Sequence, residues 1–380
     1  MHSTGTENWD IVVVGAGPAG AAAAIAARRA DAGCRVLLVD RAPIGRDKVC
    51  GDGIAPHAVA ELELLGVDAV RPDEMVPVVR LTAPGGLSAS AETRAPGYVV
   101  PRARFDARLV RAAIDAGAEF RQHRVASVEQ DGTTVTLDGT LRARTVIAAD
   151  GSNSVLRRRV GEPANRGRAL AVAVRGYAPT PDGVSRELVI RWDRQRSGGL
   201  CYAWAFPVAD GTTNVGYGLS SAAEPHDRAH LVARLAALLP EYALDGVRLT
   251  GHTLPLTIYR PRPAVGRVLL TGDAASLINP VTGEGIYSAI ASGAAAGRAA
   301  ALHPLTAAAR YTAFLAARFG RQHRQLRGLY PLIDLPVVLD TVVRAGARNR
   351  RELDRLLEVG LGDSSFSGRD VLRFARAARG

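Results

Sequence analysis

The first regular pattern in the chain is a run of four apolar residues, Ile11 to Val14, which a glycine-rich turn, an alanine-rich stretch and a second apolar run follow. The first run predicts a buried parallel strand, and residues 18–32 predict a helix that Gly33 closes. Residues 36–40 predict a second strand. The order of strand, helix and strand predicts a βαβ unit, which binds dinucleotides at the turn before its helix.

The glycines of the first turn have the spacing GxGxxG, at Gly15, Gly17 and Gly20. We expect Gly15 to allow the tight turn, Gly17 to let a diphosphate approach the backbone, and Gly20 to let the helix pack on the strand. Asp40 ends the second strand, where a carboxylate can accept hydrogen bonds from a ribose. A lone GxGxxG is a weak signal, but in this context it predicts a dinucleotide site.

Short elements follow between residues 41 and 165. Residues 41–56 are too rich in glycine, proline and aspartate for a regular element, so they predict a loop where ligand contacts usually sit. The other predicted elements are helices at 58–65 and 105–117, a hairpin at 76–93, and strands at 98–101, 125–129, 133–137 and 141–149. The last strand ends at Asp150 and Gly151, where a backbone can pass close to a ligand and a carboxylate can bind a hydroxyl-rich linker.

Long β runs dominate from residue 169 to 255 and predict an antiparallel sheet that forms the floor of a second domain. The predicted strands are 169–176, 187–192, 200–207, 212–218 and 248–256, with a helix at 226–239. Alternation places Tyr202, Trp204 and Phe206 on one face of the third strand. Aromatic residues make up only 5% of the chain, so these three predict a concentrated apolar wall, for which core packing is the alternative explanation.

A third strand-to-glycine turn ends at Gly272 and Asp273. Gly283 and Gly285 then lie where a helix that extends to about residue 301 begins. We expect them to present free amides to an anion or to an electron-rich ring edge.

The C-terminal residues 305–380 predict mostly helix, with breaks at Pro331 and Pro336. Apolar residues gather between 326 and 343, and arginines flank them on both sides. Such a segment could rest on an anionic membrane, and packing over the pocket is an equal alternative.

Composition indicates an ordinary globular protein, with 380 residues, 47% hydrophobic and 22% charged. Residues 1–9 lack the order of a secretion signal, and no apolar run approaches the roughly 20 residues of a membrane span. The three cysteines form no CxxC pair, which favours the reduced cytoplasm and argues against structural zinc. No metal site is predicted, and His57, His123, His226 and His252 are expected to be surface or core residues.

The net charge of +11 is diffuse along the chain, and no stacking aromatics are interleaved with the basic clusters. We therefore expect a lipid or a phosphorylated ligand rather than nucleic acid. Of 48 basic residues, one, Lys48, is lysine. Either codon bias left it by chance, or position 48 needs a compact ammonium that arginine cannot supply.

The strand-to-glycine turns at residues 15, 151 and 272 suit a long cofactor held along its length. We expect its adenosine at Asp40, its pyrophosphate at residues 15–20, its ribityl chain near Asp273 and a flavin ring near residues 283–285. The order GxGxxG, Ala-Asp-Gly and Gly-Asp resembles the FAD oxidoreductases of the aromatic-hydroxylase fold, over roughly the first 300 residues.

Four segments, 48–53, 102–106, 202–207 and 272–275, resemble the geranylgeranyl reductase family, which reduces isolated double bonds in isoprenoid chains. The resemblance implies that Arg102 contacts the FAD. It also implies that the pocket beside the flavin contains Cys50, Tyr202, Trp204 and Phe206. The family usually has a proline three residues before the tyrosine, and this chain has Gly199 there, so we expect the pocket wall to bend differently.

The predicted fold is α/β, with a Rossmann-like FAD-binding domain (1–75, 102–165 and 262–304), a second antiparallel-sheet substrate domain (76–101 and 166–261) and a C-terminal helical region (305–380). The predicted cofactor contacts are Gly15, Gly17, Pro18, Ala19, Gly20, Asp40, Arg41, Cys50, Gly51, Arg102, Asp150, Gly151, Gly272, Asp273, Pro280, Gly283, Gly285 and Ile286. The predicted catalytic residues are Lys48, Cys50, Tyr202, Trp204 and Phe206.

The predicted function is reduction of isolated C=C bonds in a geranylgeranyl or prenyl-quinone lipid, by hydride from reduced flavin N5 and a proton. An isolated alkene is a poor hydride acceptor, so a cation-like transition state is expected, which aromatic faces stabilise by about 0.5–2 kcal/mol each. Cys50, Tyr202 or a water that they hold is the predicted proton donor. Lys48 is predicted to bind the anionic reduced flavin or a lipid phosphate.

Three other functions stay open at this point. The first is an FAD-dependent monooxygenase of an aromatic or polyketide molecule. The second is a flavin-dependent halogenase, which has the strand motif Trp-x-Trp-x-Ile-Pro, whereas this chain has Tyr202 and Phe206 at two of those places. The third is a non-catalytic flavin-binding or membrane-docking protein. The external electron donor is expected to be NAD(P)H, bound transiently in a shared cleft, or a small ferredoxin-like carrier, because no second GxGxxG follows a strand.

Overall fold

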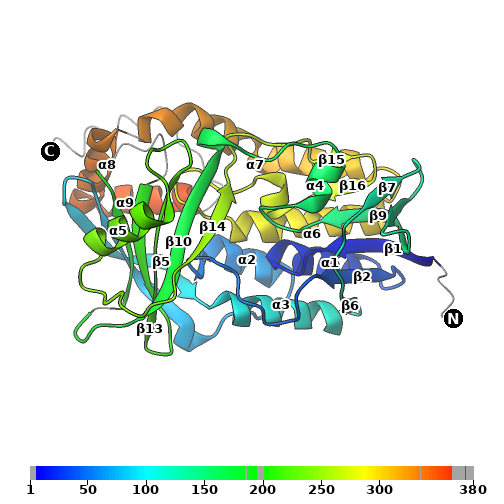
Figure 1. The fold of residues 1–380 in the computed structure, drawn as a ribbon, viewed down its shortest axis with the longest axis horizontal. Helices are drawn as coiled ribbons and strands as arrows, with labels where there is room; N and C mark the ends of the chain where they lie inside the picture. The colour runs from blue at the N-terminus through cyan, green and yellow to red at the C-terminus, as the bar shows by residue number, and fades with distance from the viewer. Residues whose placement is uncertain (1–5, 185, 195–200, 334, 362–372, 374–380) are drawn as a thin grey trace.

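Two eight-stranded sheets, joined side by side and backed by helices, form the computed structural model of the chain (Figure 1). The structure describes residues 6–184, 186–194, 201–333, 335–361 and 373. Gly199, where the family usually has proline, lies outside these residues. The α/β fold predicted from the sequence is confirmed.

The first sheet is the predicted nucleotide-binding sheet, with the strand order β15-β16-β9-β1-β2-β6 and with β7 and β8 attached beside β9. Its strands are β1 (Glu7–Val14), β2 (Val36–Asp40), β6 (Glu119–Gln122), β7 (Val128–Gln130), β8 (Val135–Leu137), β9 (Leu141–Ala148), β15 (Ala264–Val265) and β16 (Val268–Leu270). The five strands from β16 to β6 are parallel. Sequence analysis missed β6, whose residues are only half-buried or exposed and carry no apolar run.

Strands β1 and β2 are buried almost throughout because helices cover both faces of this sheet. The helices of the molecule are α1 (Pro18–Ala30), α2 (Pro56–Leu64), α3 (Arg102–Asp115), α4 (Val155–Arg159), α5 (Arg228–Leu238), α6 (Ile286–Leu302), α7 (Ala307–Ile333), α8 (Pro336–Arg348) and α9 (Arg350–Leu361), with 3-10 turns at Pro72–Glu74, Gly167–Ala169 and Gly272–Ala275. Helix α1 ends at Ala30, two residues earlier than predicted.

Helices α1 and α6 lie in backbone contact, because small residues line both facing surfaces. A Cβ atom on Gly293 would overlap the carbonyl oxygen of Ala19, and one on Gly297 would overlap that of Ala23. The alanine-rich stretch after the first glycine turn therefore has a packing role, since larger residues would push α6 away from the turn.

The second sheet has the order β14-β10-β13-β12-β11-β4-β5-β3. Its strands are β3 (Gly53–Ile54), β4 (Met75–Thr82), β5 (Ser88–Val99), β10 (Leu170–Pro179), β11 (Glu187–Trp192), β12 (Cys201–Pro207), β13 (Thr212–Ser220) and β14 (Thr250–Pro255). All described neighbours are antiparallel except β11 and β4, which are parallel. The short strand predicted at 98–101 is wrong as a separate element, because β5 continues through Val99 after an irregularity in its pairing with β4.

The C-terminal helices fold back over the second sheet, as the left side of Figure 1 shows. Val343 of α8 and Leu353 of α9 are buried against Val79 and Leu81 of β4. The predicted break at Pro331 is wrong, because α7 runs through this proline to Ile333. Pro336 does mark a boundary, since it is the first residue of α8.

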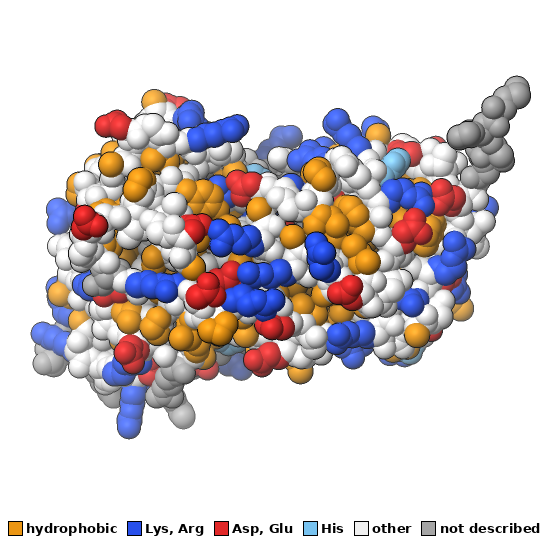
Figure 2. Space-filling model, turned by 90° about the horizontal axis from the view of Figure 1, so that it is seen from below, with side chains coloured by type: hydrophobic (Ala, Val, Ile, Leu, Met, Phe, Trp, Pro, Cys, Tyr) orange, Lys and Arg blue, Asp and Glu red, His pale blue; other side chains and the backbone are white. Residues whose placement is uncertain are grey.

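Acidic and basic side chains are interspersed over the face seen in Figure 2, in keeping with the diffuse charge of the sequence. Within the described ranges, no helix is both long and apolar enough to cross a membrane.

The contact between α1 and α6 predicts opposite effects for the same substitution at two helical glycines. We expect Gly297→Ala to destabilise the protein by about 1–3 kcal/mol, because overpacking outweighs the gain in helix propensity. Gly328→Ala in α7 is the matched control, since nothing lies within 4 Å of its added methyl group, and we expect it to stabilise by up to about 1 kcal/mol. Denaturant unfolding of both variants measures the difference, and equal shifts would contradict the packing account.

Candidate functional site

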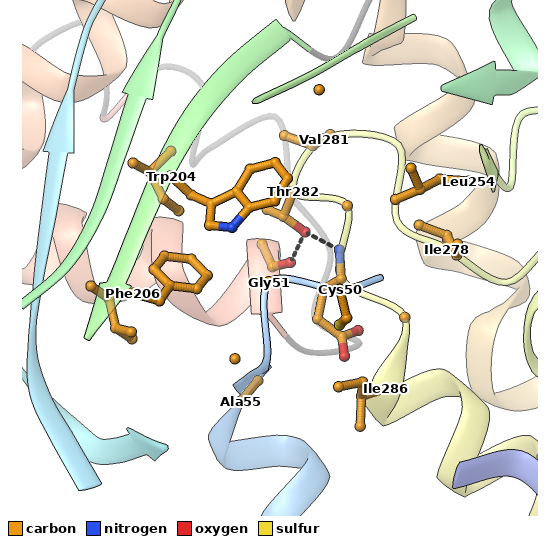
Figure 3. A pocket seen from close by; sticks show the side chains of 18 of the residues that line it. Cys50, Gly51, Ala55, Trp204, Phe206, Leu254, Ile278, Val281, Thr282 and Ile286 are labelled. Carbon is orange, nitrogen blue, oxygen red and sulfur yellow. Dashed lines mark hydrogen bonds between the residues drawn. The ribbon is translucent and has the colours of Figure 1, made fainter. Parts of the chain in front are cut away.

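A cavity of about 260 Å³ lies between the carboxyl ends of the parallel strands and one face of the second sheet (Figure 3), and residues of α9 form part of its wall. Its wall is mostly apolar. The apolar residues that line it include Val79, Leu81, Leu188, Ile190, Trp192, Leu254, Ile278, Val281, Leu326, Leu356, Leu357 and Val359. Its polar residues gather at the end nearest the first sheet and include Lys48, Arg102, His252, Asp273 and Glu284.

Twelve of the residues predicted from the sequence line this cavity: Pro18, Lys48, Cys50, Gly51, Arg102, Tyr202, Trp204, Phe206, Asp273, Gly283, Gly285 and Ile286. Ten predicted cofactor residues do not line it: Gly15, Gly17, Ala19, Gly20, Asp40, Arg41, Asp150, Gly151, Gly272 and Pro280. The two groups meet at the N-terminus of α1, where Pro18 lines the cavity and Gly17 caps the helix.

Two glycines of the turn, Gly15 and Gly20, leave no room for side chains. Gly15 has φ +104°, and a Cβ there would overlap the carbonyl oxygen of Ala149, while a Cβ on Gly20 would overlap that of Gly15. Gly17 caps α1 without a side-chain hydrogen bond, so the first amides of the helix are free to bind an anion.

Two arginines lie above this turn and supply positive charge. Guanidinium nitrogens of Arg46 and Arg102 lie 3.7 and 3.8 Å from the position that a Cβ of Gly17 would take. Asp106 holds Arg102 through two hydrogen bonds of 2.7 and 2.8 Å, and burial of this pair is nearly complete. A bare helix N-terminus with two adjacent guanidiniums fits the diphosphate of a dinucleotide.

Asp40 lies at the end of β2, beside the turn, as predicted. Its carboxylate accepts hydrogen bonds from the backbone N–H groups of Ala16 (2.8 Å) and Ala42 (2.9 Å), and Arg46 lies 3.4 Å away. The side chain of Arg41 is exposed and lies outside the cavity.

The carboxylate of Asp150 forms hydrogen bonds with residues of the turn that follows it. It accepts hydrogen bonds from the Ser154 hydroxyl (2.5 Å) and from the backbone N–H groups of Val155 (2.7 Å) and Leu156 (3.0 Å), and so caps the short helix α4. Burial raises the pKa of this carboxyl, although these hydrogen bonds oppose the shift. The structure thus shows a capping role for Asp150, and the contact with a hydroxyl-rich linker stays a prediction.

Lys48 and Asp273 form an ion pair at the polar end of the cavity, with 2.9 Å between Nζ and Oδ2. Burial acts to raise the pKa of Asp273, but the charge and hydrogen bond of Lys48 outweigh it and hold this pKa below the usual range. The one lysine of the chain is therefore placed against a half-buried carboxylate, which favours the specific explanation over chance.

His252 of β14 lines the cavity, whereas the sequence analysis expected it to be a surface or core residue. Its Nε2 lies 3.1 Å from the Ser152 hydroxyl, and its side chain lines the polar end beside Lys48. Burial and the positive charge of Lys48 lower its pKa to about 4, so the imidazole is neutral at pH 7. Nothing in the local pattern around residue 252 indicated this position.

The loop that carries Lys48 and Cys50 is tied to the second sheet by two polar residues that the sequence did not reveal. Arg175 of β10 donates to Asp47 (2.8 and 3.1 Å) and to the carbonyls of Lys48 (2.9 Å) and Cys50 (3.1 Å). Asn214 of β13 donates to the Cys50 carbonyl and to Asp52, both at 2.8 Å. These bonds fix the loop between the two sheets.

Asp52 also connects this loop to the second sheet. Its side chain is fully buried, its φ is +62°, and it accepts a hydrogen bond from the Tyr177 hydroxyl. Burial raises its pKa to about 6, while Tyr177 and Arg175 act against the rise. Gly51, the residue before Asp52, packs against Phe206 and Trp204. A Cβ atom on Gly51 would lie 3.2 Å from the ring of Phe206 and 3.3 Å from that of Trp204.

The three aromatic residues of β12 share one face and line the cavity, as alternation predicted (Figure 3). The rings of Tyr202 and Trp204 meet edge to face with centroids 6.0 Å apart. The Trp204 Nε1 donates to Asn214 (2.9 Å), and a Cβ on Gly216 would overlap the indole ring. The Tyr202 hydroxyl donates to the carbonyl of Thr282, so this wall is joined to the turn before α6.

The turn before α6 contains a carboxylate that the sequence analysis passed over. Glu284 lies between the two predicted glycines, lines the cavity and is half-buried. Burial raises its pKa to about 7, against the backbone N–H groups of Tyr287 and Ile286, which lower it. A glutamate between two glycines at a strand-to-helix turn is a local signal that could have been used.

The end of α9 is joined to the same turn. The carbonyl of Gly360 accepts hydrogen bonds from the Thr282 hydroxyl (2.7 Å) and from the Asn279 side chain (3.3 Å). Helix α9 therefore lines the cavity and is hydrogen-bonded to the turn before α6.

Comparison with known proteins agrees with this geometry. A family model described as FAD binding domain matches residues 8–309. A menaquinone reductase of Mycobacterium tuberculosis is 34% identical over 360 residues, which cover 88% of this chain and 86% of that protein. Digeranylgeranylglycerophospholipid reductase 1 of Methanopyrus kandleri is 35% identical over 326 residues, which cover 77% and 80%.

Solved structures share the fold over nearly the whole chain. A geranylgeranyl bacteriochlorophyll reductase-like protein of Thermoplasma acidophilum has a TM-score of 0.80 with 24% identity, over 97% of this chain and 96% of that one. A flavin-dependent brominase has a TM-score of 0.74 with 18% identity, over 98% of each chain, so fold alone does not separate these activities. By its family model and its relatives, the chain belongs to the FAD-binding domain family and, within it, to the geranylgeranyl reductase family that its sequence motifs resemble.

Proposed function

We propose that this protein reduces isolated C=C bonds in the isoprenoid chain of a lipid or quinone. The observation that carries the proposal is the apolar cavity, whose aromatic wall faces the loop of Cys50 and reaches the polar end that holds Lys48 and Asp273. The menaquinone and digeranylgeranylglycerophospholipid reductases, at 34–35% identity, support the same class of substrate.

FAD fits the site along its length. We assign the diphosphate to the N-terminus of α1 and the guanidiniums of Arg46 and Arg102, the ribose to Asp40, and the ring to the turn at residues 283–285. The reduced cofactor supplies the hydride. The ion pair of Lys48 and Asp273 lies at the same end of the cavity, where Lys48 is placed to balance negative charge.

The chain itself supplies the environment in which an isolated alkene can react. Tyr202, Trp204 and Phe206 exclude water from one side of the cavity, and their ring faces stabilise positive charge that develops on carbon. Each kcal/mol of stabilisation that is specific to the transition state changes the rate about fivefold. We propose that Cys50 helps to position the substrate beside this wall.

The external electron donor is proposed to be NAD(P)H or a reduced ferredoxin-like carrier. The net charge of +11 favours approach of either anionic partner. Anaerobic mixing of the FAD-loaded protein with each donor, monitored by flavin absorbance, distinguishes them.

We also propose peripheral contact with an anionic membrane through the junction of α7 and α8. Leu332 and Val337 are 47% and 66% exposed there, and the exposed Arg324, Arg327 and Arg344 flank them. Leu326 lies between two of these arginines in sequence and lines the cavity, so a lipid chain would have a short path to it. The alternative of core packing is correct for Leu326, Tyr330 and Val343, which are buried.

Incubation of dithionite-reduced protein with geranylgeranyl lipid and with menaquinone, followed by mass measurement, tests the proposed activity. We expect a gain of two hydrogens for each reduced bond. Repeating the incubation with air and NAD(P)H, with and without halide, tests the other activities of the fold. Gain of oxygen or halogen, or no change with FAD bound, would overturn the proposal.

Substitution of Lys48 tests its proposed role beside the cofactor. We expect Lys48→Met to slow reduction of the bound flavin about fivefold to tenfold, a loss of about 1–1.4 kcal/mol, because Asp273 loses its neutralising partner. Lys48→Arg keeps the charge but not the compact ammonium, so it should recover only part of the rate. Stopped-flow absorbance gives both rates, and an unchanged rate in Lys48→Met would show that the ammonium is dispensable.

Sedimentation with vesicles tests the membrane contact. Binding to anionic vesicles at low salt is expected, with strong weakening in Val337→Asp, because a charge replaces an exposed apolar side chain at the proposed surface. The matched control is Leu305→Asp, which makes the same kind of change at a site that is 85% exposed near the other end of α7. Equal binding by both variants would contradict the proposed surface.

A further inference from the structure

Glu284 is the one glutamate that lines the cavity among the described residues. It lies between Gly283, whose φ is +70°, and Gly285, the N-cap of α6. A Cβ on Gly285 would lie 3.0 Å from Ile278, so the turn is pressed against the cavity wall. The glutamate is therefore held on a tight turn at the polar end, where the cofactor and substrate regions meet.

Hydrogen bonds on both sides fix the position of this carboxyl group. Oε1 accepts from the backbone N–H of Tyr287 (2.7 Å), and the Glu284 carbonyl accepts from the N–H of Asn279 (2.8 Å). The Glu284 N–H donates to the Thr282 hydroxyl (3.3 Å), and the Thr282 carbonyl is held by Tyr202. The aromatic wall thus positions the turn that carries the acid.

The cations at this end of the cavity are engaged with other carboxylates. Lys48 pairs with Asp273, and Arg102 pairs with Asp106. His252 on β14 is neutral at pH 7 and bonded to Ser152. The charged group that acts on Glu284 is Asp273, which has the same sign.

The pKa values of two carboxyl groups at one end of the cavity are therefore shifted in opposite directions. Asp273 stays ionised because Lys48 stabilises its charge, whereas burial and the repulsion from Asp273 raise the pKa of Glu284 to about 7. Environments that separate the pKa values of neighbouring acids mark acid and base roles in enzyme sites. An acid whose pKa lies near the working pH is also the most effective proton donor.

Tyr202 is a poorer source of the proton. Its hydroxyl hydrogen is donated to the Thr282 carbonyl, and burial raises its pKa well above the ordinary value for tyrosine. Its contact assigns it a different task, which is to hold the turn that carries Glu284.

We propose that Glu284 is the general acid that delivers the proton to the alkene, an inference that rests on the proposed reductase function. The π electrons of the C=C bond form a new C–H bond with the proton from the Glu284 carboxyl group. The second carbon accepts the hydride, so the substrate gains two hydrogens, the reduced FAD gives up two electrons and Glu284 is left as a carboxylate. Because Glu284 is only half-buried, it regains a proton from water.

The test compares Glu284→Gln, Glu284→Asp and the matched control Glu162→Gln. Glu162 is a buried glutamate outside the cavity that pairs with Arg262 at 2.6 Å. Each variant, purified with FAD, is reduced by dithionite and mixed with geranylgeranyl lipid or menaquinone in a single turnover. Infrared spectra across pH are recorded in parallel, with and without FAD, to follow the carboxylic C=O band.

We expect Glu284→Gln to slow the single turnover 10²-fold or more, while its FAD content is unchanged. The wild-type rate should fall as the pH rises through about 7, because the acid form is lost, and the rate in Glu284→Gln should not follow this profile. Glu284→Asp should recover part of the rate. A carboxylic band that titrates near pH 7 should be present in the wild type and missing in Glu284→Gln.

The outcomes separate this inference from the function on which it rests. If the wild type reduces no alkene, the proposed function fails, whereas the infrared band still reports whether Glu284 holds a proton. If the wild type is active and Glu284→Gln is equally fast, the general-acid role is overturned and the function stands. An equal loss in Glu162→Gln, or the absence of a titrating band, would also overturn it.

Discussion

The position of one loop, residues 47–52, decides whether the two sheets form a single site. Arg175 and Asn214 of the second sheet hold it through the carbonyls of Lys48 and Cys50, and Asp52 is buried beneath it. Because the side chains of Arg175 and Asn214 are buried, loss of their acceptors would leave buried donors unpaired, which costs more than the hydrogen bonds themselves contribute. The nucleotide turn and the aromatic wall therefore meet at a loop of fixed shape.

The arrangement of charge at the inner end of the cavity follows from this constraint. The loop places Lys48 against Asp273, and the charge that acts on Glu284 is that of Asp273, which has the same sign. An apolar cavity that ends in an ion pair and a carboxyl group of raised pKa is suited to a long hydrocarbon whose reacting bond lies at that end. The same end fits a bound flavin, since the glycine turns there present backbone rather than side chains.

Local patterns predicted the parts of the site that depend on backbone conformation. The turns at Gly15, Gly272 and Gly283 and the aromatic face of β12 follow from spacing and alternation, which a single sequence displays. Arg175 and Asn214 were missed because their partners lie more than 100 residues away along the chain. His252 was missed because its environment comes from Lys48 and Ser152 on other segments.

The end of α9 has two roles. It forms part of the cavity wall, and the carbonyl of Gly360 accepts a hydrogen bond from Thr282 in the turn before α6. Leu356, Leu357 and Val359 of this helix line the cavity, while Gly360 bonds to the turn that carries Glu284. A ligand that displaced α9 would therefore also strain these hydrogen bonds. The width of whatever occupies the cavity is thus coupled to the geometry of the turn at its polar end.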